Sequence, residues 1–204
     1  KFMMFWRNGV TYGRVVTLSG SDSSVQASKG TSVTIGGGGS RFRHSFANCG
    51  NGKIVMVNYN SGNTDYESVV LQVASNGTGT TFTSGSAQTI SGDGQNELSS
   101  TIFHSSGKVI TAYITNSGGW AWYYRVGTVG TNTVSWATEA SLVGNVGSLR
   151  IFEAKTGGNG EIIAMYYSGG AVKYKVGTIS GTSISWGSEQ TLFSTSNTSG
   201  LSGL

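Results

Sequence analysis

The sequence predicts an all-β protein, a β-propeller of about four four-stranded blades, from three observations. Four apolar segments recur along the 204 residues, with starts at Lys1, Lys53, Lys108 and Glu161 that lie 52, 55 and 53 residues apart. β-branched and aromatic residues fill these segments, and clusters of Gly, Asn, Ser and Thr separate them. No stretch keeps a helical period, and four strands in roughly 50 residues are typical of a propeller blade.

The repeat sets the expected organisation. We expect one β-propeller-type repeat domain over 1–204, with units at approximately 1–40, 41–94, 95–144 and 145–200. A sandwich would not predict a fixed repeat, and a β-solenoid repeats in about 20–30 residues. The chain opens on the second strand of a unit, so two arrangements stay open. The last residues complete the first blade of a four-bladed ring, or further sequence or other subunits complete a larger ring or array.

The strands within a unit differ in their apolar pattern. The second strand is apolar at consecutive positions around Ile54, Val109 and Ile162, so both of its faces should be buried. The third strand alternates, with Trp122 on one side and Arg125 on the other, which is the period of a half-exposed strand.

The fourth strand carries a recurring tryptophan, Trp136 in one unit and Trp186 in the next. Because these residues recur, we expect them to pack against a neighbouring blade. The strands Val126–Trp136 and Val176–Ser188 share Val-Gly-Thr, an apolar residue, and then Ser-Trp. They resemble the propeller-like repeats of tail-fibre and other virion structural proteins of marine bacteriophages, including cyanophages. The first unit departs most, since it has no aromatic residue at the tryptophan position.

This resemblance implies a non-enzymatic structural protein, in a virion or extracellular, that serves assembly, decoration or host-surface attachment. It carries no catalytic motif and implies no cofactor. The expected partners are other virion subunits or copies of the chain itself, and a host-surface glycan.

Composition excludes several other classes of protein. The 13 Lys and Arg residues form no run that could track phosphates, so no nucleic-acid partner is expected. The longest apolar runs are far shorter than the ~20 residues of a membrane helix, so no membrane insertion is expected. The single cysteine, Cys49, lies in a turn-like segment and excludes an internal disulfide framework or a cysteine-rich zinc site.

A secreted carbohydrate-binding propeller is the alternative function. Aromatic rings beside amides and hydroxyls suit sugars, because a ring covers the apolar face of a pyranose. The candidate ligand-binding residues come from turns and strand ends: Trp6, Asn60, Asn63, Asp65, Tyr66, Asn116, Trp120 and Tyr167. A column of cations is expected to meet an anionic polysaccharide or to protect a sheet edge: Arg14, Arg125, Lys173 and Lys175.

A degenerate sialidase-like glycosidase is the third hypothesis. Such propellers carry Asp boxes, whereas the turns before the two tryptophans have Asn132 and Ser183 instead of aspartate. Glu139 and Glu189 recur between units, which favours a structural role over catalysis. Asp65 and Glu67 are the best-placed acidic pair for an ion or ligand contact, and His44 and His104 are interpreted as unrelated strand residues. No catalytic residue and no metal site is therefore expected.

Overall fold

The fold is all-β in the part of the chain that the structure describes. This computed structural model describes residues 1–8, 10–20, 24–35, 41–92, 99–115, 121–144, 146–154 and 160–194, apart from the side chains of Phe2, Arg41, Phe42 and Asn76. These residues form four antiparallel sheets and one short 3-10 turn, η2 (Ser75–Gly77). Within them, no helix has the length and apolar character needed to cross a membrane.

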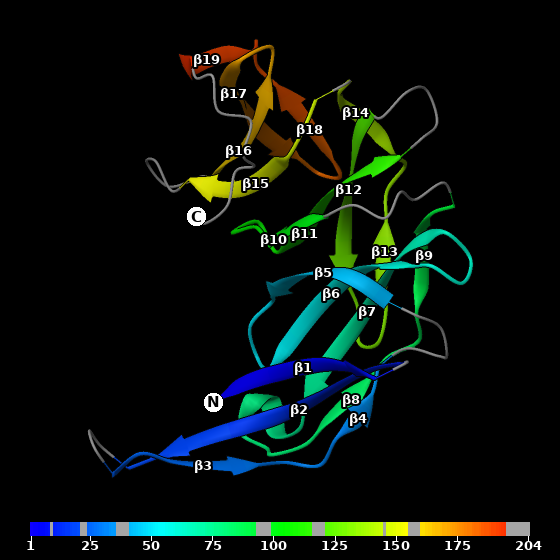
Figure 1. Ribbon diagram of the computed structural model, residues 1–204, viewed down its shortest axis with the longest axis vertical. Helices are drawn as coiled ribbons and strands as arrows, with labels where there is room; N and C mark the ends of the chain where they lie inside the picture. The colour runs from blue at the N-terminus through cyan, green and yellow to red at the C-terminus, as the bar shows by residue number, and fades with distance from the viewer. Residues whose placement is uncertain are drawn as a thin grey trace.

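The four sheets follow one another along the chain (Figure 1). The first consists of β1 (Phe2–Asn8), β2 (Val10–Ser19), β3 (Gln26–Lys29) and β4 (Val33–Thr34). The second consists of β5 (Arg41–Asn48), β6 (Lys53–Asn60), β7 (Asp65–Val73), β8 (Phe82–Ser84) and β9 (Gln88–Ser91). The third consists of β10 (Ser100–Phe103), β11 (Lys108–Thr115), β12 (Ala121–Val129), β13 (Val134–Trp136) and β14 (Ala140–Val143). The fourth consists of β15 (Leu149–Ala154), β16 (Glu161–Ser168), β17 (Ala171–Ser180), β18 (Ser183–Trp186) and β19 (Gln190–Ser194).

The outer edge of each sheet differs from the expected single fourth strand. Two short strands share this edge, so that β13 pairs with one end of β12 and β14 with the other. Between them the Ala137 amide donates to the Val126 carbonyl at 2.9 Å. Gly30, Gly85 and Gly187 make the same bond to Val15, Val70 and Val176. The repeated bond fixes where the chain leaves the first short strand for the second.

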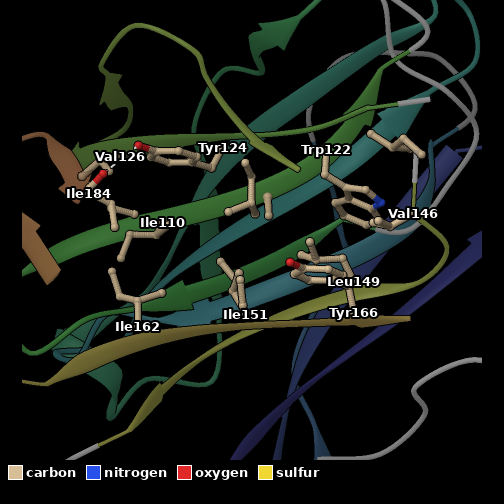
Figure 2. Close-up of a cluster of buried hydrophobic side chains, with 14 residues drawn as sticks. Ile110, Trp122, Tyr124, Val126, Val146, Leu149, Ile151, Ile162, Tyr166 and Ile184 are labelled. Atoms are coloured by element: carbon tan, nitrogen blue, oxygen red, sulfur yellow. Dashed lines mark hydrogen bonds between the residues drawn. The ribbon is translucent and has the colours of Figure 1, made fainter. Parts of the chain in front are cut away.

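The sheets stack in chain order, and each pair of neighbours encloses a core. We call the face of a sheet that points to the next sheet its forward face, and the opposite face its backward face. The first core contains Val15 and Ile35 from the first sheet with Met56, Val69, Leu71, Val73 and Phe82 from the second. In the third core, Ile110, Trp122 and Tyr124 of the third sheet face Leu149, Ile151 and Tyr166 of the fourth (Figure 2).

Burial on both faces explains the consecutive apolar residues of the second strands. In β6, Val55 and Val57 belong to the core shared with the third sheet, whereas Met56 belongs to the core shared with the first. Each side chain so buried contributes roughly 1.5–3 kcal/mol. Stacking of sheet on sheet is therefore the main source of stability.

Two faces of the stack have no neighbouring sheet among the residues that the structure describes. Figure 1 shows the first and fourth sheets at opposite ends of the long axis. The backward face of the first sheet and the forward face of the fourth are therefore the end faces of the molecule. Large apolar side chains are exposed in both of these sheets, including Met4 and Leu18 at one end and Leu192 at the other.

Candidate functional site

The best-formed polar and aromatic group lies on the end face of the first sheet. Trp6 of β1 pairs in register with Tyr12 of β2, and their rings stack with centroids 5.7 Å apart and planes 16° from parallel. The guanidinium carbon of Arg14 lies 4.8 Å from the centroid of the Trp6 ring. Alternation along two paired strands brings these three side chains to one face. The arrangement is a cation held against an aromatic row.

A hollow of about 280 Å³ lies beside this row, and Met4, Trp6, Arg14 and Lys29 line it. Met4 is 44% exposed, and Arg14 also donates from Nη2 to the Ser32 hydroxyl. The Arg14 Nε atom is buried without a hydrogen-bond partner. The hollow thus has almost wholly apolar walls, to which Arg14 and Lys29 contribute mainly their carbon atoms, and Arg14 Nε is not reached by solvent.

Two of the predicted ligand residues are buried in strands. Asn60 ends β6, is 6% exposed and donates to the Glu67 carboxylate at 2.9 Å. Tyr66 lies near the start of β7, is fully buried and packs against Tyr59 and Tyr113 with ring centroids 5.9 and 5.2 Å apart. We predicted turn or strand-end positions for both, and the structure places them inside the two strands that flank the four-residue turn 61–64. Neither the Tyr66 ring nor the Asn60 side-chain amide is therefore exposed to a ligand.

The acidic pair that we predicted meets at one amide. Asn63 Nδ2 donates to Asp65 Oδ2 at 2.7 Å and to Glu67 Oε1 at 3.3 Å. The Thr89 hydroxyl also donates to Asp65. The pair is held by these hydrogen bonds within the second sheet, and it lies apart from the Trp6 row.

The remaining predicted residues do not converge on Trp6. Tyr167 is half-buried in β16, at the other end of the stack. Asn116 and Trp120 lie outside the described residues. The structure therefore brings together Trp6 with residues that the sequence analysis did not select as a group.

Three members of the predicted cation column have partners within the chain. Arg125 Nε donates to the Tyr113 hydroxyl at 3.1 Å, and Lys175 Nζ donates to the Leu142 carbonyl at 3.3 Å. Lys173 pairs with Glu189 at 2.6 Å. Arg14, the fourth member, donates to the Ser32 hydroxyl, and its Nε atom is buried without a hydrogen-bond partner.

The recurring glutamates each accept a tyrosine hydroxyl. Tyr113 donates to Glu139 at 2.5 Å, and Tyr166 donates to Glu189 at 2.6 Å. Burial and then the bond to the carboxylate raise the pKa of both phenols. The hydrogen bonds from Lys173 and Tyr166 hold the pKa of Glu189 below its usual range. These contacts give the glutamates structural partners.

The histidines and the cysteine lie in separate surroundings. His44 Nε2 contacts the Thr11 hydroxyl at 3.5 Å in the first sheet, whereas buried His104 bonds the Gly160 carbonyl at 2.9 Å. Burial raises the pKa of the Cys49 thiol to about 11, so little thiolate forms at neutral pH. In the described ranges, no three His, Cys, Asp or Glu side chains group closely enough to hold a metal ion.

Four members of the group around Trp6 were not predicted from the sequence: Met4, Tyr12, Lys29 and Ser32. Strand register identifies Lys29. Val16 and Gly127 hold the same repeat position, and Val16 pairs with Lys29 whereas Gly127 pairs with Trp136. Lys29 thus occupies the tryptophan position of the first unit.

Comparison with protein-family models, curated proteins and solved structures finds no match to this chain.

Proposed function

We propose that the chain is a non-enzymatic structural module, four consecutive propeller-type blades whose end faces bind further copies head-to-tail. The forward end face of one copy packs on the backward end face of the next, as neighbouring sheets pack within the chain. A virion or extracellular setting stays a prediction from the resemblance of the repeats.

One repeat position supports this proposal most directly. Ile90, Leu142 and Leu192 each sit at the bulge where the last short strand pairs with the central strand of its sheet. Ile90 and Leu142 are 1% and 4% exposed because the next sheet covers them, whereas Leu192 is 55% exposed. The fourth sheet therefore has a side chain suited to a sheet-to-sheet core, but none of the described sheets covers it.

The other end face has a matching feature. Phe2 in β1 and Ile54 in β6 hold the same repeat position, and they pair with Val16 and Leu71. Leu18 and Val73 each lie two residues after these partners, so they also share one repeat position. Val73 is 7% exposed and belongs to the first core, whereas Leu18 is 50% exposed. Because the two end faces are different surfaces, a contact between them is heterologous and forms a ring or an open stack.

Charge substitutions at the two ends test the proposal. We expect the native chain to exceed its 21.2 kDa monomer mass in sedimentation as concentration rises. Leu192→Glu and Leu18→Glu should each block association, because a carboxylate would be buried without a partner. A mixture of the two variants should form a one-to-one dimer, since one intact face remains on each.

Two results would contradict head-to-tail binding. A native chain that stays monomeric at every concentration excludes association of copies. Dimers of Leu18→Glu alone would show that the fourth sheet binds itself instead. Ser135→Glu, at an exposed position of β13 in the third sheet, is the matched control and should associate like the native chain.

A further inference from the structure

The Arg14 site corresponds to a repeated group whose carboxylate is absent in the first sheet. Arg14 pairs with Met4, Arg125 with Thr111 and Lys175 with Ala164, so all three cations share one repeat position. The repeated amide-to-carbonyl bonds of Gly30, Ala137 and Gly187 align the residues that follow. Ser32, Glu139 and Glu189 each lie two residues after the residue that makes this bond, so they share one repeat position.

In the third and fourth sheets this position completes an aromatic, cation and carboxylate group. Glu139 accepts from Tyr113, which also accepts from Arg125. Glu189 accepts from Tyr166 and from Lys173, which pairs with Tyr166 and so holds the repeat position of Tyr12 rather than that of Arg14. The first sheet keeps the aromatic residue and the cation as Trp6 and Arg14. It replaces the carboxylate with the Ser32 hydroxyl, which is shorter and uncharged.

The space beside Arg14 is open in the first sheet. In the third sheet the neighbouring second sheet covers this group, because Tyr66 of β7 packs on Tyr113. None of the sheets that the structure describes covers Arg14, and Arg14 lines the hollow together with Met4 and Lys29. A volume of about 280 Å³ is at the small end of ligand sites, enough for a single compact ring.

We propose that this hollow binds a carboxylate-bearing sugar residue of the uronic acid type. The sugar carboxylate takes the position of the missing glutamate and pairs with the terminal guanidinium nitrogens of Arg14, with the Lys29 ammonium as a second charge. The C–H face of the sugar ring packs on Met4 and the edge of Trp6. A saturated ring with one acid group satisfies both the apolar walls and the cations.

The test uses the Leu192→Glu variant, which keeps the first sheet's end face open whether or not copies associate. A glucuronic acid tetrasaccharide is titrated by NMR against a glucose tetrasaccharide of equal length. We expect the acidic probe to shift resonances of Trp6 and Arg14 and to bind at least about tenfold more tightly than the neutral one. Equal binding of both probes, or none, overturns the proposal.

Two further variants separate binding from folding. Arg14→Gln should reduce affinity at least about tenfold, whereas Lys108→Gln, which removes one positive charge from the third sheet, should not. Ser32→Glu restores the carboxylate within the chain, so it should abolish binding and raise Tm. Unchanged binding by Ser32→Glu would refute the site. An equally tight glutamate tetrapeptide would show that a peptide, not a sugar, is recognised.

These outcomes are independent of head-to-tail assembly. A monomeric native chain that binds the acidic sugar keeps this inference and removes the proposed function. Association without sugar binding does the reverse. If both hold, the sugar and a second copy compete for one face, and the acidic tetrasaccharide should lower the sedimenting mass of the native chain.

Discussion

At the scale of single residues, two tryptophans at one repeat position differ in a single hydrogen bond. Trp136 Nε1 donates to the Ser68 hydroxyl at 2.9 Å, whereas Trp186 Nε1 is buried without a partner. Both rings are half-buried against a neighbouring core, as their recurrence predicts. Position 68 in the second sheet corresponds to Tyr124 in the third, which meets Trp186 edge-on at 5.8 Å. The same residue type therefore has different energetic roles in the two sheets.

Replacing each tryptophan with phenylalanine separates these roles. Trp136→Phe removes a satisfied donor and orphans Ser68, so it should cost about 1–2 kcal/mol more than Trp186→Phe. Trp186→Phe removes a donor that has no partner, which offsets part of the lost packing. Urea unfolding of both variants measures the difference. A larger loss for Trp186→Phe would mean that its indole nitrogen is satisfied in solution.

The buried phenols should make the fold sensitive to alkali. Because burial and the neighbouring glutamates raise the pKa of Tyr113 and Tyr166 in the folded state, the neutral phenol is favoured there. Their contribution is complete below the unfolded pKa of about 10 and is lost as pH rises above it. We expect the urea midpoint to fall between about pH 9 and pH 11.5. The double variant Tyr113→Phe/Tyr166→Phe should show a smaller fall, and an equal fall would assign the effect to other groups.

At the scale of elements, residue pairs across the outer strands compensate for one another in size. Gly127 pairs with Trp136 and Gly177 with Trp186, whereas the corresponding pair in the second sheet is Leu71 with Ser84. A Cβ at Gly127 would lie 2.8 Å from the Trp136 ring, so the large indole requires a neighbour without a side chain. In the second, third and fourth sheets this pair position thus holds one large and one small residue, in either order.

A double-mutant cycle measures this compensation. Gly127→Ala should destabilise by about 1–3 kcal/mol through the clash with the indole and with Val134. In a Trp136→Ser background the same change should cost less, because the contact with the indole is gone and only the one with Val134 remains. The difference in unfolding free energy is the coupling. Additive effects would show that Val134 or the backbone conformation, not the indole, requires glycine at this position.

The sequence predicts the elements better than it predicts the site. Spacing and alternation locate the second and third strands, because both faces of those strands are constrained by packing. The segment from Asn60 to Asp65 has the composition of a long loop, yet it holds a four-residue turn between strands that bury Asn60 and Tyr66. Lys29 and Ser32 carry no recognisable pattern, since only strand register places them at the tryptophan and glutamate positions.

At the scale of the whole molecule, stacking predicts that stability varies from sheet to sheet. The second and third sheets each pack on two neighbours, whereas the first and fourth pack on one. In such a linear array, the units with fewer interfaces open more readily. Amide exchange should therefore be slower in β6 and β11 than in β2 and β17.

Raising the protein concentration tests whether the ends are covered by other copies. If end faces bind head-to-tail, exchange in β2 and β17 should slow with concentration, while β6 and β11 stay nearly unchanged. The reason is that opening an end sheet then also breaks an interface between copies. Leu192→Glu should exchange at the same rates at low and high concentration. Concentration-independent exchange in the native chain would mean that the end faces stay in contact with solvent, and that the sugar site on the first sheet is always accessible.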